Sequence, residues 1–166
     1  KRVRQAIAHA INKQETIEGV LLGLGRPAVG PYKPGTWWYK DDVKTFPFDP
    51  ERAKALLADA GWKPRASDGI LEKDGMPFSF TIRTNQGNSV RQQTAEIIQR
   101  RLRAVGIDAR IHVVEWAAFL NTFIRKKDFE AIILGWGLGL DPDQYEIWHS
   151  SKTGPEDLNH ISYQNP

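Results

Sequence analysis

Residues 129–145 read FEAIILGWGLGLDPDQY, a stretch in which an apolar run stops abruptly. The run from Ala131 to Leu134 ends at a Gly-Trp pair, two more glycines follow, and Asp-Pro-Asp then signals a turn and a helix start. Because the run shows no polar alternation, both faces of this strand are expected to be covered, as at the centre of a parallel or mixed sheet. The pattern therefore predicts a strand, a loop and a helix in succession.

The loop after this strand is the first candidate for a binding site. Loops that leave the carboxyl ends of strands in open α/β sheets commonly carry the ligand site. Trp136 stands there on a backbone made pliable by Gly135, Gly137 and Gly139, and its ring can offer a flat apolar face to a ligand. The alternative is that Trp136 covers the core while the glycines only form a turn. The local sequence leaves both interpretations open.

Asp141 and Asp143 place two carboxylates just beyond these glycines. Next to Pro142 and directly after a loop, they are more typical of helix caps than of an acid–base pair. The sequence also contains no nucleophile elbow, no phosphate-binding Gly-Lys-Ser/Thr loop and no dinucleotide fingerprint. We therefore expect no catalytic residue, no cofactor and no enzymatic activity.

The histidine and cysteine content argues against a metal centre. His9, His112, His149 and His160 lack the spacing of metal ligands, and an isolated histidine is far more often a surface or hydrogen-bonded residue. The lack of cysteine excludes disulfides, thiol catalysis and cysteine-based zinc sites, and it fits either an oxidising or a reducing compartment. We expect no metal ligands in this chain.

Length and composition indicate one globular domain. A chain of 166 residues with 40% hydrophobic and 26% charged residues can bury a core and is not of the disordered type. No apolar run is long enough to cross a bilayer, and Lys1 does not open a secretory signal. Because the chain begins directly at a helix and without methionine, we expect it to be a fragment of a longer protein.

The segments upstream of residue 129 follow a strand, helix, strand order. Residues 78–82 alternate as a strand, residues 89–105 have helical periodicity, and residues 107–113 alternate again, which predicts a right-handed parallel crossover. Further predicted elements are helices at 3–11, 15–22, 50–60 and 116–124 and a small hairpin within 63–77. The fold class is therefore α/β: a single domain over residues 1–166, with a mixed sheet and flanking helices.

Residues 23–49 form a long loop that is rich in glycine, proline and aromatic residues. Aromatic residues on an irregular segment either pin it to the domain or face a partner, and we expect most of these to pin it. Trp37 and Trp38 in this segment, together with Asn85 in the loop after the strand at 78–82, are further candidates for a ligand cleft.

A second function class is a free-standing nucleic-acid-binding module that uses the loop aromatics and a basic helix. Arg100, Arg101 and Arg103 form a basic patch on the helix at 89–105. However, cations are favoured near a helix carboxyl end, the net charge is only +3, and acidic residues are mixed among the basic ones. A solvated helix face is the favoured interpretation, with no nucleic-acid partner.

Several motifs now agree in their order along the chain. They are VRQAIAHAINK at residues 3–13, FDPERAKALL at 48–57, AGW at 60–62, GI at 106–107, EW at 115–116, and GW at 135–136 ending in DP at 141–142. In this order they resemble the extracellular solute-binding proteins of the peptide/nickel type (family 5), which serve bacterial ABC importers. The resemblance covers nearly the whole chain. Members of that family are longer, so it implies a type II periplasmic-binding-protein lobe, most of the C-terminal one of two.

The resemblance also implies roles for single residues. In peptide-binding members the tryptophan of the Gly-Trp pair lines the ligand cavity, as does that of the Glu-Trp pair; here these are Trp136 and Trp116. Such members hold the peptide amino group with an acidic residue three positions beyond the Gly-Trp tryptophan, but Gly139 stands there. Asp141 can take that role only if the shortened loop brings it inward.

The function that the resemblance implies is non-catalytic capture of a solute in a cleft between two lobes. The solute is expected to be an oligopeptide, with an oligosaccharide or another small solute stacked on tryptophans as the alternative. The implied partner is the membrane permease of an ABC importer. The implied location is periplasmic or extracellular, with a lipoprotein anchor left open, and we expect a monomer.

Overall fold

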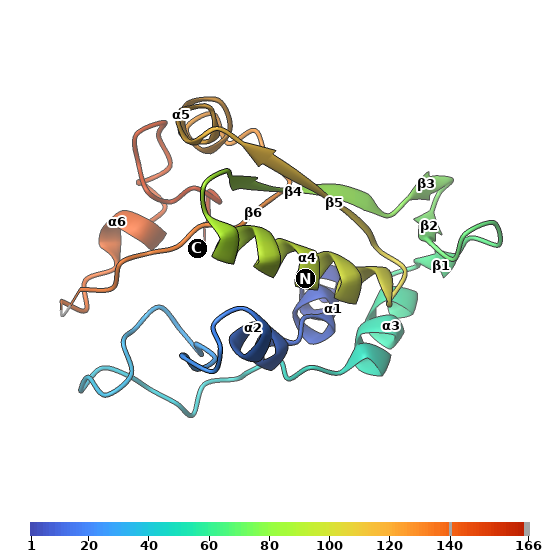
Figure 1. The fold of residues 1–166 in the computed structure, drawn as a ribbon, viewed down its shortest axis with the longest axis horizontal. Coiled ribbons are helices and arrows are strands. Elements are labelled where there is room, and N and C mark those ends of the chain that lie inside the picture. Colours follow the sequence, from blue (N-terminus) through green and yellow to red (C-terminus); the bar gives the residue numbers. More distant parts are fainter. Residues whose placement is uncertain (140, 165–166) are drawn as a thin grey trace.

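A three-stranded parallel sheet with the order β5-β4-β6 forms the centre of the structure (Figure 1). The computed structural model describes residues 1–139 and 141–164. In it β4 spans Ser79–Asn85, β5 spans Asp108–Val114 and β6 spans Ala131–Ile132. The predicted parallel α/β unit is confirmed, and its three strands follow the predicted segments.

The register of β4 against β5 is continuous over the whole length of both strands. Ser79 lies opposite Asp108 at one end, and Asn85 lies opposite Val114 at the other. The helix α4, Ser89–Arg103, connects the two strands and packs on both. It begins where the Asn88 side chain accepts a hydrogen bond from the backbone N–H of Arg91 at 3.0 Å, which is an N-cap.

The strand β6 is less covered than its sequence predicts. Ala131 and Ile132 are only half-buried, because β6 is the outer strand of the sheet in the described residues. Ile133 continues the strand with a backbone hydrogen bond to the Arg83 carbonyl at 3.0 Å. The expectation of a central strand is therefore wrong for this chain, although the strand itself and its direction are as predicted.

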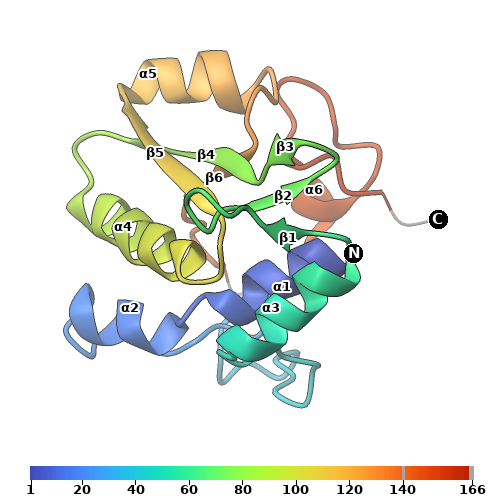
Figure 2. The same cartoon turned by 90° about the vertical axis from the view of Figure 1, so that its right-hand side faces the viewer.

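Helices cover both faces of the sheet, which gives three layers (Figures 1 and 2). On one face lie α4 and the helices α1, Arg2–Ala10, α2, Lys13–Gly19, and α3, Pro50–Asp59. On the other lies a short helix whose first turn is α5, Trp116–Ala118, and whose remainder is the π-helix Phe119–Ile124.

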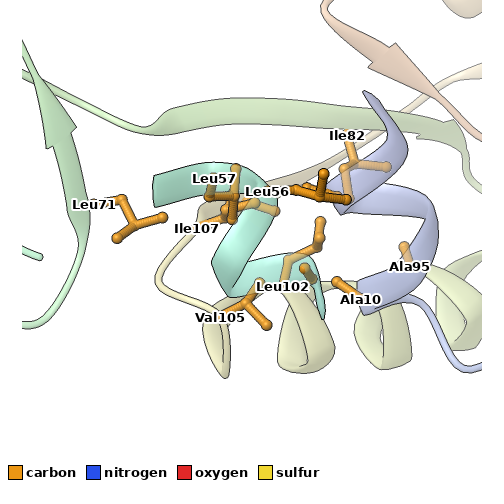
Figure 3. Close-up of a cluster of buried hydrophobic side chains, with 12 residues drawn as sticks. Ala10, Leu56, Leu57, Leu71, Ile82, Ala95, Leu102, Val105 and Ile107 are labelled. Atoms are coloured by element: carbon orange, nitrogen blue, oxygen red, sulfur yellow. The ribbon is translucent and has the colours of Figure 1, made fainter. Parts of the chain in front are cut away.

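The core lies between the sheet, α1, α3 and α4 (Figure 3). Its buried residues are Ala6, Ala10, Ala53, Leu56, Leu57, Leu71, Ile82, Ala95, Leu102, Val105, Ile107 and Ala109. Small residues on α1 let that helix approach α3 closely, while leucines and isoleucines fill the space against the sheet. Asp49 caps α3 by accepting a hydrogen bond from the Arg52 backbone at 2.9 Å, as the Asp-Pro pair predicts.

A separate antiparallel sheet packs at the end of the molecule opposite the carboxyl ends of β4 and β5 (Figure 1). It consists of β1, Lys63–Pro64, β2, Leu71–Lys73, and β3, Met76–Pro77. The predicted hairpin is its β2–β3 pair. All antiparallel pairing in the described residues belongs to this small sheet, while the main sheet is parallel throughout.

Two further features complete the fold. Residues 23–49 contain no helix or strand, and the segment runs on the side of α1 and α2 that faces away from the sheet (Figures 1 and 2). A four-residue helix, α6, Tyr145–Trp148, follows the glycine-rich loop. Among the described residues, no helix combines the length and the apolar character that a membrane crossing requires.

Gly106 provides a test of how α4 must end. Its φ is 85°, and a Cβ atom at this position would lie 2.8 Å from Leu71 Cγ and 3.1 Å from the Gly69 carbonyl oxygen. The left-handed backbone and the overpacking together predict that Gly106→Ala lowers the free energy of unfolding by about 2–4 kcal/mol. Denaturant unfolding of the complete protein measures this loss.

Gly137→Ala is the matched control, since no atom lies within 4 Å of a Cβ atom there and the backbone is not left-handed. We expect it to leave the unfolding midpoint nearly unchanged. Equal destabilisation by the two substitutions would contradict the proposed origin of the turn at Gly106.

Candidate functional site

The carboxyl ends of the three parallel strands meet at one edge of the sheet. Because β4 pairs with both neighbours in parallel, Asn85 ends beside Val114, and Arg83 lies opposite Ile132. The chain then leaves β5 through Glu115 and leaves β6 through the Gly-Trp pair, so both candidate tryptophans start from this edge. Glu115 caps α5 by accepting a hydrogen bond from the Ala118 backbone at 3.0 Å, which fixes the start of the helix that carries Trp116.

Trp116 and Trp136 line a common cavity of about 310 Å³. The other residues of its wall are Leu120, Ile124, Arg125, Leu134, Gly135, Pro155, Glu156, Asp157, Leu158 and His160. Both tryptophan side chains are 43% exposed, so each has apolar ring surface that the described residues do not cover. We refer to this space as the tryptophan cavity.

Trp136 also lines a second cavity of about 190 Å³ together with Trp148, Leu158 and His160. Its indole ring stacks on the His160 imidazole, with ring centroids 5.4 Å apart and an interplanar angle of 15°. Burial, reinforced by the nearby Lys127 ammonium, lowers the pKa of His160, so the ring is neutral at neutral pH. Trp136 is thus held on one side by an uncharged aromatic ring.

The segment that carries His160 is fixed by two polar residues. Lys127 Nζ donates hydrogen bonds to the Thr153 carbonyl at 2.6 Å, to Ser162 Oγ at 2.8 Å and to the Asn159 carbonyl at 3.3 Å. Asn159, fully buried, donates to the Tyr163 carbonyl at 2.9 Å and accepts from the Tyr163 backbone N–H at 2.8 Å. These bonds tie residues 153–163 into the fold behind Trp136.

A third group, Arg91, lies beside the tryptophan cavity. Its guanidinium donates a hydrogen bond to Asn85 Oδ1 at 2.6 Å and lies 5.8 Å from the centroid of the Trp116 ring. A Cβ atom at Gly135 would lie 3.5 Å from the same guanidinium. Arg91 therefore contacts Asn85, Trp116 and Gly135, three residues that the sequence analysis named as candidates. Arg91 itself was not among those candidates.

Other candidate residues lie outside this cluster. Gly137, Gly139 and Asp141 line neither cavity, and Asp141 Oδ1 accepts a hydrogen bond from the Asp143 backbone at 2.8 Å. Asp143 in turn accepts from the Tyr145 backbone N–H at 2.8 Å, so each carboxylate binds the backbone N–H two residues further on, as in an Asx turn. The prediction that they cap the helix is wrong, because the N-cap of α6 is Gln144, which makes no side-chain hydrogen bond there. The structure supplies no contact between Asp141 and the cavity.

The two tryptophans of the long loop also lie outside the cluster. Trp37 and Trp38 pack edge to face with ring centroids 5.1 Å apart, and they line neither cavity that Trp136 lines. Trp37 is 87% exposed, whereas Trp38 is half-buried. The two tryptophans of this segment are thus buried against the domain to different degrees.

The basic helix face is partly engaged by contacts within the chain. Arg100 and Arg101 both bind the Glu15 carboxylate, and the hydrogen bond from Arg101 is the main cause of the lowered pKa of Glu15. Two of the three arginines of the patch are therefore engaged with α2 instead of being free for phosphates. Within residues 1–139 and 141–164, no group of three or more His, Asp or Glu side chains is arranged to hold a metal ion.

Sequence reasoning missed Arg91 and His160 for different reasons. Arg91 lies in the first turn of the helix that follows a parallel strand, a position that could have been flagged as close to the ligand edge. His160 has no local signal, because its partner Trp136 is 24 positions away in the sequence and the contact depends on the folded tail.

The fold and the cavity together define a class of protein. An apolar cavity walled by half-exposed tryptophans at the carboxyl edge of a parallel sheet is the arrangement of a small-molecule binding domain. Comparison with known families agrees: residues 1–157 match the model described as bacterial extracellular solute-binding proteins, family 5 Middle. The chain belongs to this family of bacterial extracellular solute-binding proteins.

Individual relatives support the assignment. The oligopeptide-binding protein AppA of Bacillus subtilis is 44% identical over 168 residues, which cover 99% of this chain and 31% of the relative. The dipeptide-binding protein of Escherichia coli is 36% identical over 147 residues, covering 87% of this chain and 25% of that protein. The chain thus spans about a third or less of the length of the curated relatives it matches.

Solved structures give the same result. The structure of Bacillus subtilis AppA in complex with a nonapeptide matches with a TM-score of 0.89 and 42% identity, covering 99% of this chain and 33% of that one. NikZ of Campylobacter jejuni, solved in complex with Ni(L-His), also matches with a TM-score of 0.89, at 27% identity and with the same shares covered. These relatives are binding proteins, and the type of fold predicted from the sequence is confirmed.

Asn159 offers a test of the support behind Trp136. Asn159→Ala removes the bonds to the Tyr163 backbone and to the His149 carbonyl, leaving buried polar groups without partners. We expect a loss of about 1–3 kcal/mol in the free energy of unfolding and faster amide hydrogen exchange at residues 153–163. Hydrogen exchange followed by mass spectrometry locates the effect.

Gln14→Ala is the control, because Gln14 is exposed and its side chain donates a hydrogen bond to Glu18 on the same helix, α2. It is expected to leave exchange at residues 153–163 unchanged. Normal exchange there in Asn159→Ala would contradict the role assigned to the buried amide.

Proposed function

We propose that this chain is part of the substrate-binding component of an ABC importer, which captures oligopeptides or similar small solutes without chemical change. The observation that carries the proposal is the tryptophan cavity, whose two indole rings are each 43% exposed. Large half-exposed apolar rings at the ligand edge of a parallel sheet supply binding energy, and no activated nucleophile is found among the described residues around them. Family membership and the peptide-binding relatives support the same proposal.

The chain is proposed to form most of one lobe of a two-lobe protein. It spans about a third of its relatives, and a cavity with one wall open to solvent needs a second wall to bury a ligand. An apolar groove of about 310 Å³ that includes Ala131, Ile132 and Ile133 of the outer strand supports this idea. Such a groove fits further packing of the sheet within a longer protein.

Partner and location follow from the same proposal. The complete protein is proposed to deliver its solute to the membrane permease of an ABC importer and to work outside the cytoplasmic membrane, in the periplasm or at the cell surface. The family description, extracellular solute-binding, supports the location. The proposed form is a monomer; a lipoprotein anchor is the alternative to a protein that moves freely in the periplasm.

The tryptophans provide the direct test of the binding site. Trp116→Ala and Trp136→Ala in the complete protein are each expected to weaken peptide binding by about 1–3 kcal/mol, since each removes a large apolar contact surface. Calorimetric titration with peptides of two to nine residues measures the affinity. Thermal unfolding of each variant shows whether the fold is kept.

Trp37→Ala is the comparison variant, as it removes a mostly exposed tryptophan that lines neither cavity. Its affinity should equal that of the unsubstituted protein. The site assignment fails if Trp37→Ala weakens binding while the other two variants bind normally.

The amino terminus of the peptide provides a second test. Gly139 stands where peptide-binding members are expected to carry an acid, and Asp141 is turned to the backbone of Asp143. Without a desolvated carboxylate partner, acetylation of the peptide amino terminus should change affinity by less than about tenfold, the change that 1.4 kcal/mol produces. A larger loss, abolished by Asp141→Asn, would show that Asp141 takes over the acid's role.

A further inference from the structure

One wall of the tryptophan cavity is a helix that changes type along its length. Trp116–Ala118 forms an α-turn, and Phe119–Ile124 continues it as a π-helix. Here the Arg125 backbone N–H donates a hydrogen bond to the Leu120 carbonyl at 2.9 Å, five positions earlier in the chain. Hydrogen bonds of this i→i+5 type are rare in proteins, and they occur frequently at functional sites. The wall of the candidate site therefore holds one residue more in this turn than an α-helix would.

The five-residue spacing sorts side chains of this helix into two pairs. Phe119 and Ile124 are five positions apart, and both are buried, with 0% and 2% exposure. Leu120 and Arg125 are also five positions apart, and both line the tryptophan cavity, to which Ile124 also contributes. In an α-helix, which has about 3.6 residues per turn, residues five positions apart point about 140° away from each other. The π-helix thus lets one short segment bury the first pair while it presents the second pair to the cavity.

The two ends of this helix are held by contacts outside the π-helix. At the start, the Glu115 side chain accepts a hydrogen bond from the Ala118 backbone N–H at 3.0 Å, directly after β5. Beyond the end, the Lys127 ammonium donates to the Thr153 carbonyl at 2.6 Å and to Ser162 Oγ at 2.8 Å. Because both ends are held, the number of residues between them decides how far the wall reaches into the cavity.

Lys127 adds a second unusual backbone feature to the same segment. Its φ is 55°, in the left-handed region that a residue with a Cβ atom rarely adopts. Strained conformations and π-turns persist where the surrounding structure enforces them, and they cluster at ligand sites. Two such features in one segment beside the cavity indicate a constraint on the shape of the wall.

We propose that the π-helix Phe119–Ile124 is a positioning element of the solute site. A turn that holds an extra residue is wider than an α-turn, so it carries Leu120 and Arg125 further toward the solute. The inference rests on the proposed function and adds the element that sets the width of the cavity. It assigns the contact between the helix wall and a bound solute to the length of this segment, not to one side chain.

Deletion of Thr122 from the complete protein tests the proposal. Thr122 is exposed, and its loss brings each of the two pairs to a spacing of four, which one face of an α-helix accommodates. We therefore expect the variant to fold with an α-helical wall that is withdrawn from the cavity. Its affinity for peptides should fall about tenfold or more. The probes are trialanine and a nonapeptide of serine and alanine, both with free termini, in calorimetric titrations.

Thr122→Ala is the matched control, because it removes the side chain and keeps the length of the segment. It should bind both peptides as the unsubstituted protein does. Thermal unfolding of both variants checks that each is folded.

Hydrogen exchange of the unsubstituted protein supplies a measurement that needs no variant. Bound peptide should slow amide exchange at residues 119–128, which contain the π-helix and its end. Residues 63–77, which contain the small antiparallel sheet at the opposite end of the molecule, should exchange at the same rate with and without peptide (Figure 1).

The other outcomes separate the inference from the proposed function. A folded deletion variant with full affinity would overturn the inference and leave the proposed function standing. So would an equal loss of affinity in Thr122→Ala, because the side chain and not the length would then be responsible. If the deletion variant does not fold, slowed exchange at residues 119–128 supports the inference and unchanged exchange there overturns it. Failure of the unsubstituted protein to bind these or any other peptides of two to nine residues rejects peptide capture itself, and the inference with it.

Discussion

The parallel pairing of β4 with both of its neighbours is the constraint on which the candidate site depends. It aligns Asn85 with Val114 and Arg83 with Ile132, so that the chain segments leaving β4, β5 and β6 all begin at one edge of the sheet. Trp116 and Trp136 are 20 positions apart in the sequence, yet they line one cavity for this reason. An antiparallel partner for β4 would send one of these segments to the opposite end.

Polar groups hold the irregular segment that forms one wall of the cavity. Residues 153–163 have no helix or strand, and their position depends on the Lys127 ammonium and the buried Asn159 amide. Such bonds fix geometry because leaving them unmade in a buried place is costly. These bonds hold His160 in place, and the His160 ring stacks on one side of the Trp136 ring while part of Trp136 stays exposed.

The sequence predicted most of what is local. Asp49, Pro50 and Gly106 mark helix ends through short-range backbone chemistry, and the structure has those ends where these residues place them. The apolar run at residues 131–134 predicted a strand buried on both faces, but these residues are only half-buried. An apolar run shows that a strand is suited to burial, and it does not show whether the elements that bury it lie within the same 166 residues. His160 contacts Trp136 only through the folded tail, so no spacing pattern could reveal it, whereas Arg91 lies in the first turn of the helix after a parallel strand, a position that the sequence does indicate.

The central claim is that a solute sits against Trp116 and Trp136. The most direct measurement is a crystal structure of the complete protein with a bound peptide. The account predicts peptide atoms in contact with both indole rings. A peptide bound elsewhere, with both rings still open to solvent, would contradict it.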